Sequence, residues 1–186
     1  MEFSTQRLIS RPMAEADETL FCDLYTDAET MRFIGPPLAR DRAARGFLTI
    51  LKLMRRESAD QVFFTICTRD TGEAVGISSI QHLDIAGRRT EAGIIIGPLH
   101  RSRGFAKEGL SSLIRFAFDN LPVDEVWVQI AVDHTVVEKL VTGVGLARGA
   151  ETALGQSTLR IWSAHRDSWL RSAAGNLSGE CNVGRH

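Results

Sequence analysis

The sequence predicts an α/β (α+β) domain in which one mixed sheet carries helices on both faces. Two observations lead to this fold class. Helical and strand-like patterns alternate along most of the 186 residues, and an antiparallel meander precedes a strand–helix–strand stretch. The length suits one domain with a sizeable core. We therefore expect a single domain over residues 1–172 and a flexible tail over residues 173–186, which is rich in Gly, Asn and Ser.

The first half of the chain predicts two helices and then a hairpin. Residues Ala16–Tyr25 and Ala43–Met54 each place apolar side chains on one helical face, and Gly35-Pro36-Pro37 separates them. Val62–Thr68 is rich in aromatic and β-branched residues, which favours a strand. An Asp-Thr-Gly turn then leads into a second strand over Glu73–Leu83, as in a hairpin.

The second half predicts a central strand and a long amphipathic helix. Thr90–Gly97 is aliphatic on both faces, which is typical of an internal strand. Arg103–Asn120 carries apolar residues at helical spacing. Two further strands, Val126–Val132 and Leu159–Ala164, flank a short helix over His134–Thr142.

Composition excludes several classes of function. A formal net charge of −1 argues against a nucleic-acid partner, which would call for a basic excess. No apolar run is long enough for a membrane span, and the N-terminus lacks the apolar core of a signal peptide, so we expect a cytoplasmic protein. The three cysteines, Cys22, Cys67 and Cys181, form no metal-binding or disulfide spacing, and we expect no metal.

The turn between the central strand and the long helix has the chemistry of an anion site. The first turn of a helix offers unpaired N–H groups and the positive end of the helix dipole. Gly104 lacks a Cβ that would obstruct an anion there, and Arg101 and Arg103 add positive charge. The turn contains neither a P-loop nor a dinucleotide fingerprint. Taken alone, it is equally compatible with a surface turn carrying solvated arginines.

The surrounding motifs give the turn a context. Arg101–Ala106 is similar to the [Q/R]-x-x-G-x-[G/A] loop of the GNAT N-acetyltransferase superfamily. The segment STQRLISRPMAEAD (Ser4–Asp17) resembles the T-x-R-L-x-x-R-P…D opening of its RimJ/RimL branch of ribosomal-protein alanine acetyltransferases. Asp27–Pro37 resembles the stretch after that branch's first helix, and Trp162–Trp169 resembles its closing strand and R-x-x-W helix. The resemblance covers about residues 3–170.

This resemblance implies the fold and the donor. It implies a GNAT fold with a central sheet of about six to seven strands that is splayed at its centre. Acetyl-CoA, or another acyl-CoA, would be the co-substrate, and the protein would be a monomer or a homodimer. Pantetheine would pair with the edge of Thr90–Gly97, and a strand N–H near Ile94–Ile96 would polarise the thioester oxygen. The cofactor-binding residues implied are Ile94, Ile95, Ile96, Arg101, Ser102, Arg103, Gly104, Phe105 and Ala106.

The implied reaction is direct acyl transfer to an amine of a small molecule or a protein N-terminus, which requires a base. Glu91, at the start of the central strand, is the first candidate, and a solvated strand-end glutamate is the alternative. His82, near the end of the preceding strand, is the second, because imidazole exchanges protons near neutral pH. Asp133 and His134 follow the next strand and complete the candidate set.

The chain departs from the family pattern on the acceptor side. Where many members carry N-x-x-S, it has Asp133-His134-Thr135-Val136-Val137, and its single tyrosine, Tyr25, lies on the first predicted helix. An aromatic pair that is common before the loop is replaced by isoleucines. Two alternatives therefore stay open: a catalytically altered acyl-CoA-binding or regulatory module, and a transferase for oxygen acceptors or larger acyl groups.

Overall fold

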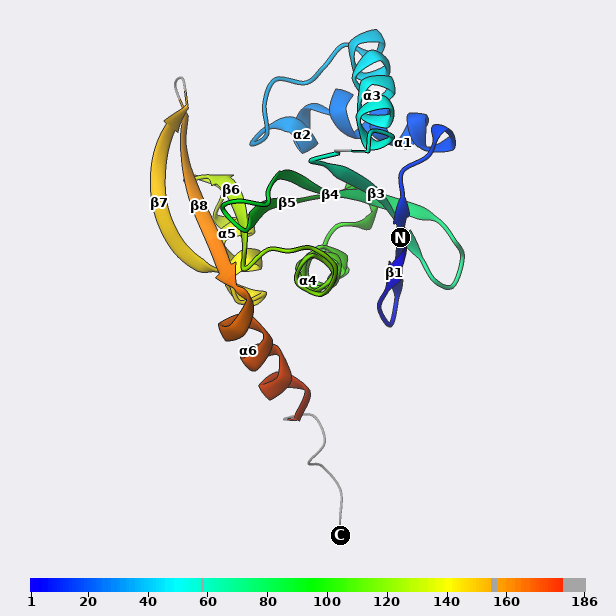
Figure 1. Ribbon diagram of the computed structural model, residues 1–186. Coiled ribbons are helices and arrows are strands. Elements are labelled where there is room, and N and C mark those ends of the chain that lie inside the picture. The colour runs from blue at the N-terminus through cyan, green and yellow to red at the C-terminus, as the bar shows by residue number, and fades with distance from the viewer. Residues whose placement is uncertain (58, 155–156, 179–186) are drawn as a thin grey trace.

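The computed structural model describes residues 1–57, 59–154 and 157–178, and a single sheet organises them (Figure 1). The sheet has eight strands in the order β1-β2-β3-β4-β5-β6-β8-β7. All neighbouring pairs are antiparallel except β5 and β6. The expected α/β class with a mixed sheet is confirmed, with one or two strands more than expected.

The elements follow one another along the chain as the sequence predicts. The strands are β1 (Phe3–Ser4), β2 (Leu8–Pro12), β3 (Val62–Thr68), β4 (Ala74–Asp84), β5 (Arg89–Ile96), β6 (Glu125–Ala131), β7 (Ala147–Leu154) and β8 (Ser157–His165). The helices are η1 (Glu15–Asp17), α1 (Glu18–Thr26), α2 (Ala28–Met31), α3 (Arg40–Met54), η2 (Pro98–His100), α4 (Phe105–Asn120), α5 (Thr135–Gly143) and α6 (Arg166–Ser178).

Helices cover both faces of the sheet, and each face has its own core. On one face lie α1 and α3 (Figure 1). They pack through Phe21 and Phe47 against Ile77 of β4. On the other face, α4 and α5 pack against the sheet through a larger cluster that includes Leu113 and Val126. Because successive side chains of a strand point to opposite faces, each inner strand supplies residues to both cores.

The central strand shows this division residue by residue. Ile94 and Ile96 pack on the α4 side of the sheet, while Ile95 packs with the α1–α3 cluster. By the same alternation, Glu91 and Gly93 share a face with Ile95. The prediction that this strand is internal and apolar on both faces is therefore confirmed.

The sheet separates at its centre. Strands β5 and β6 pair through three residue pairs only, Arg89 with Glu125, Thr90 with Val126 and Glu91 with Trp127. Beyond Glu91 the two strands have no shared register, while β5 stays paired with β4 as far as Ile96. The expected splay is thus present, and its apex lies at Glu91 and Trp127.

Several elements differ from the sequence expectation. The element patterns did not reveal β1, β2, β7 or the short helix α2. The long helix begins at Phe105 instead of Arg103, because Ser102 and Gly104 have φ values of 62° and 80°, which a right-handed helix excludes. Helix α6 continues to Ser178, within the expected tail, and residues 179–186 of that tail lie outside the described residues.

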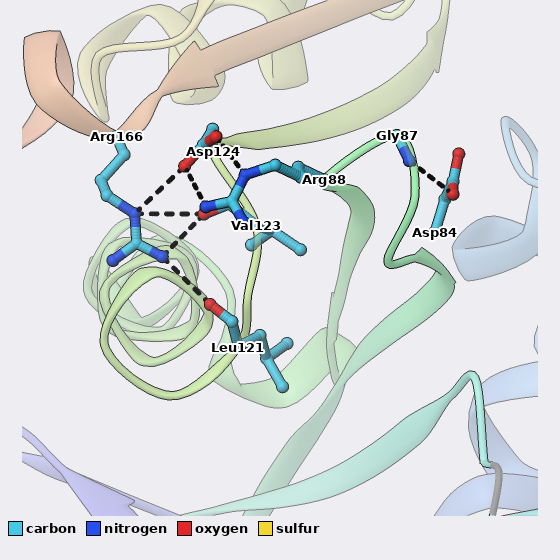
Figure 2. A network of polar contacts seen from close by, with 7 residues as sticks. All are labelled: Asp84, Gly87, Arg88, Leu121, Val123, Asp124 and Arg166. Atoms are coloured by element: carbon cyan, nitrogen blue, oxygen red, sulfur yellow. Dashed lines mark hydrogen bonds and ion pairs between the residues drawn. The ribbon is translucent and has the colours of Figure 1, made fainter.

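A polar network fixes the C-terminal helix to the body of the fold (Figure 2). The guanidinium of Arg166 donates to the carbonyl oxygens of Leu121 and Val123, which end α4 and lead into β6. Its neighbour Asp124 pairs with Arg88, the residue before β5. One turn further along α6, the Trp169 indole donates to a backbone carbonyl at 2.7 Å and closes the core beside α5.

Candidate functional site

The loop before α4 presents a row of backbone N–H groups. Ser102 and Gly104 both have positive φ, and Gly104 is the N-cap of α4. Within the described part of the chain, the amides of residues 102–107 donate to no protein acceptor. Successive free amides at a helix N-terminus form a concavity that binds anions. This loop therefore fits the diphosphate of CoA.

The first strands brace this loop from the side. The carboxylate of Glu108, in the first turn of α4, accepts hydrogen bonds from the Thr5 hydroxyl and from the Arg7 backbone and guanidinium. Arg7 also donates to the Arg103 carbonyl at 2.9 Å and lies over the ring of Phe105. Burial alone would raise the pKa of Glu108, but these hydrogen bonds outweigh it and keep the pKa below its ordinary value. The carboxylate is thus a charged anchor for the loop.

The predicted cofactor residues do not all face the same way. Arg103 has an exposed side chain without an ion pair among the described residues, so it is available to a phosphate. Arg101 is already engaged, because its guanidinium donates to the Glu29 carboxylate at 2.9 Å, the Thr30 hydroxyl at 2.6 Å and the Ile96 carbonyl at 3.2 Å. Its predicted role as a phosphate ligand stays a prediction, and in this structure it joins the loop to α2.

The three isoleucines of β5 contribute to the site through their backbone. Their side chains are core residues on either face of the sheet, which accounts for their aliphatic character. The edge of β5 that faces β6 has no strand partner from Ala92 to Ile96. This edge is where an extended ligand can pair with the strand.

Two of the predicted bases form one unit at the apex of the splay. The Nδ1 of His82 and the Oε2 of Glu91 lie 2.7 Å apart in a hydrogen bond. Residue His82 stands on a bulge between β4 and β5 and has a φ of 50°, an unusual value for a residue other than glycine. The Glu91 side chain is 20% exposed and that of His82 is 69% exposed. The pair therefore connects a mostly buried carboxylate to solvent.

Trp127 lies next to the Glu91–His82 pair. Its indole lies nearly parallel to the His82 imidazole, at 16° with ring centroids 6.2 Å apart. The Arg89 guanidinium lies over the same indole at 5.5 Å from the ring centroid. Trp127 is the β6 partner of Glu91 in the sheet register. Trp127 thus lies beside the Glu91–His82 pair at the apex of the splay.

The other two candidates lie at the far end of β6. Asp133 is exposed, whereas His134 is half-buried and caps α5. The imidazole of His134 stacks on the ring of Phe33, with centroids 4.0 Å apart and planes 23° apart. Burial lowers the pKa of His134, Arg101 and Arg32 add to that shift, and Asp133 opposes it. The structure thus joins Glu91 with His82 and places His134 in a separate contact.

Several residues at the site escaped sequence reasoning. Arg7 and Glu108 hold the loop, while Thr30 and Phe33 contact Arg101 and His134. The T-x-R-L motif was a signal for Arg7, but its partner is 101 residues away, so the fold is needed to find it. Thr30 and Phe33 lie within the Asp27–Pro37 segment that resembles the family, but that resemblance gave no contact for either residue.

Two absences hold for the described residues. No group of three or more His, Cys, Asp or Glu side chains is arranged to hold a metal ion there. None of the helices described is both long and apolar enough to cross a membrane.

The sequence has relatives that share most of its length. The family described as "Acetyltransferase (GNAT) domain" matches residues 7–147. The protein named "Uncharacterized N-acetyltransferase p20" from Bacillus licheniformis is 26% identical over 158 residues, which span 82% of this chain and 88% of that protein.

Solved structures share the fold. The spermidine N-acetyltransferase of Vibrio cholerae, determined in complex with CoA and spermine, has a TM-score of 0.77 and 16% identity, covering 89% of this chain and 99% of that chain. RimL, a ribosomal L7/L12 alpha-N-protein acetyltransferase determined in complex with CoA, has a TM-score of 0.78 and 10% identity, covering 90% of this chain and 99% of that chain.

Proposed function

Because the chain belongs to the acetyltransferase (GNAT) domain family, we propose that it transfers an acetyl group from acetyl-CoA to an amine of a small molecule or a protein N-terminus. The observation that carries this proposal is the hydrogen-bonded pair of Glu91 and His82 at the apex of the splay. The pair supports the proposal because its carboxylate can serve as the proton acceptor that acyl transfer to an amine requires and that acyl-CoA binding alone does not.

The donor side follows from the loop and from the free strand edge. Acetyl-CoA supplies a thioester whose acetyl group is transferred. The amides around Gly104, with Arg103 beside them, hold the diphosphate. The unpaired edge of β5 binds the pantetheine arm, and an N–H near Ile94–Ile96 polarises the thioester oxygen.

The acceptor side requires removal of one proton. The amine nitrogen attacks the thioester carbon, a C–N bond forms, and the C–S bond breaks with its electrons on sulfur. Glu91 accepts the proton that the nitrogen loses, and His82 passes it to solvent through its exposed ring. The thiolate leaves as the thiol once it has taken up a proton from solvent. Holding amine and thioester together supplies further rate through positioning.

The two structural neighbours, named for a polyamine and a ribosomal-protein N-terminus, both use amine acceptors. Their names support an amine acceptor here without selecting its class. The aliphatic β5 gives no separate support to a larger acyl group, because its isoleucines are accounted for by core packing.

Glu91→Gln tests the proposed base. We expect kcat with an accepted amine to fall about 10²- to 10⁴-fold, as for loss of a general base, while the Kd for CoA stays unchanged. His82→Ala should give a smaller loss in kcat, since the Glu91 carboxylate remains. The measurement is thiol release from acetyl-CoA across a panel of amines.

Glu125→Gln is the matched control. Glu125 lies on the neighbouring strand with a similar exposed fraction, 24%, and pairs with Arg89 outside the Glu91–His82 unit. Its kcat should equal that of the wild type. If Glu91→Gln retains full activity, Glu91 is not the base. If CoA binds tightly and no amine in the panel turns over, the chain is a binding module.

A further inference from the structure

The short helix α2 and the three residues that follow it are tied to the fold at two places. We call this segment, Ala28–Ile34, the α2 strap. The first tie is Arg101, whose guanidinium binds Glu29 and Thr30 of α2 and also the last carbonyl of β5. Thr30 is itself buried, and its hydroxyl also donates to Asp27. One end of the strap is thus fixed to the end of β5.

The second tie fixes the other end of the strap to β6. Phe33 stacks on His134, which follows the last residue of β6 by three positions and is the N-cap of α5. The Arg32 guanidinium also lies over the Phe33 ring, 5.1 Å from its centroid. A neutral imidazole suits such a stack, and the burial that lowers the pKa of His134 favours the neutral form.

The two ties connect the α2 strap to the two strands that separate, β5 and β6. Because β5 and β6 pair only near their starts, their ends are the widest part of the opening. Arg101 follows the end of β5 and His134 follows the end of β6, so a segment that contacts both must cross the opening. Resting on the proposed function, we propose that the α2 strap is the roof of the channel that holds the pantetheine arm, with Phe33 and His134 as its positioning residues.

Two ligands distinguish the role proposed for the α2 strap, covering the pantetheine arm, from the role of the loop before α4, binding the diphosphate. CoA carries the pantetheine arm, whereas 3′-phosphoadenosine 5′-diphosphate carries the nucleotide and its phosphates but no arm. The roof contacts only the arm, so strap variants should change the affinity for CoA and leave the affinity for the nucleotide unchanged. Both Kd values can be measured by titration calorimetry on the full chain.

Phe33→Ala and His134→Ala each remove the stack. We expect the Kd for CoA to rise about three- to tenfold, which is the usual contribution of an aromatic pair, and the Kd for the nucleotide to stay within twofold. His134→Phe retains a ring and should restore CoA binding, which separates a positioning role from a role in proton transfer. Val136→Ala changes an exposed side chain of the same helix and is the control.

Thermal unfolding of each variant shows whether it is folded, and Phe33→Leu gives a second, milder removal of the stack. If the variants lose the same affinity for CoA and for the nucleotide, the α2 strap does not cover the pantetheine arm. It would instead support the loop that binds the diphosphate. An unchanged Kd for CoA in both Phe33→Ala and His134→Ala would also contradict the proposal that the α2 strap covers the pantetheine arm. A wild-type protein that binds CoA but acetylates no amine would overturn the proposed function and leave this comparison of ligands intact.

Discussion

At the scale of single residues, Gly104 serves the loop in two ways. It lacks a Cβ, as the sequence suggested, and its φ of 80° is a left-handed conformation that other residues rarely adopt. A Cβ there would also lie 3.2 Å from the Arg7 guanidinium, which supports the same loop. Any side chain at this position therefore strains the backbone of the loop and crowds the Arg7 guanidinium that supports it.

Gly104→Ala should weaken CoA binding and lower stability together. The left-handed backbone costs an alanine about 1–2 kcal/mol, and relief of that strain moves the amides that hold the diphosphate. Gly72→Ala is the matched control, since Gly72 has a φ of 72° in the β3–β4 turn with no heavy atom within 4 Å of a new Cβ. Its stability should fall by a similar amount with an unchanged Kd for CoA. Equal CoA binding by both variants would contradict a role for Gly104 in the site.

The sequence did not predict that His82 and Glu91 form a pair. Both were candidates, but as alternatives, because nothing in the pattern shows that residues nine positions apart meet. The antiparallel register places Gln81 opposite Glu91, and the bulge after Gln81 turns the next side chain toward the carboxylate. A bulge depends on the partner strand, so a one-strand pattern does not contain it.

At the scale of elements, the N-terminal motif proves to be structural. Arg11 of β2 forms a bidentate ion pair with Asp17 of η1, at 2.8 and 2.7 Å, and the Ala14 amide donates to the same carboxylate. Asp17 is 4% exposed. Burial alone would raise the pKa of Asp17, but the hydrogen bonds from Arg11 and Ala14 outweigh it and hold the pKa below its ordinary value of 3.8. The R-P…D part of the motif thus connects β2 to the first helix.

Asp17→Asn should lower the free energy of unfolding by about 2 kcal/mol at pH 7, as for a partly buried ion pair with further hydrogen bonds. A carboxylate whose folded pKa is lowered stabilises the fold above its ordinary pKa and loses that effect as pH falls through the folded value. The difference between wild type and variant should therefore shrink below pH 3.8. Urea unfolding of both proteins at several pH values measures this difference in the free energy of unfolding.

Asp41→Asn serves as the comparison for that experiment. Its ion pair with Arg45 is exposed on α3, with exposed fractions of 67% and 70%. The expected loss of stability is small, because solvent screens an exposed ion pair and it contributes little to the folded state. A loss in Asp17→Asn no larger than this, or one that does not depend on pH, would contradict the structural role of the pair.

The elements that sequence reasoning found are those with a strong apolar period. Helix α4 and strands β3 and β5 supply most of the buried side chains near the site, and their order and type were predicted. Strand β2 is five residues long and ends in proline, and β7, ARGAETAL, consists largely of small and charged residues. Both are edge or near-edge strands whose pairing depends on their neighbours, so their own sequences carry little signal.

At the scale of the whole molecule, α6 secures the C-terminal strands to the rest. Arg166 donates to the Leu121 and Val123 carbonyls just beyond α4 (Figure 2). Its guanidinium also lies over the Phe118 ring. Arg166→Ala leaves these partly buried carbonyls without a donor, so we expect Tm to fall by about 5 °C. Arg171→Ala, at an exposed position of the same helix, should leave Tm unchanged. Equal Tm values for the two variants would show that the network does not stabilise the fold.

The three residue pairs between β5 and β6 have a mechanical consequence. Apart from the two-residue pairing of β1 with β2 at the edge, the other strand pairs are longer antiparallel ladders, so the short parallel joint is the most compliant line inside the sheet. A force that widens the opening would bend the sheet along this line. The width of the opening is then set by elements that span the joint, α4 beneath it and the contacts at Arg101 and His134 above it.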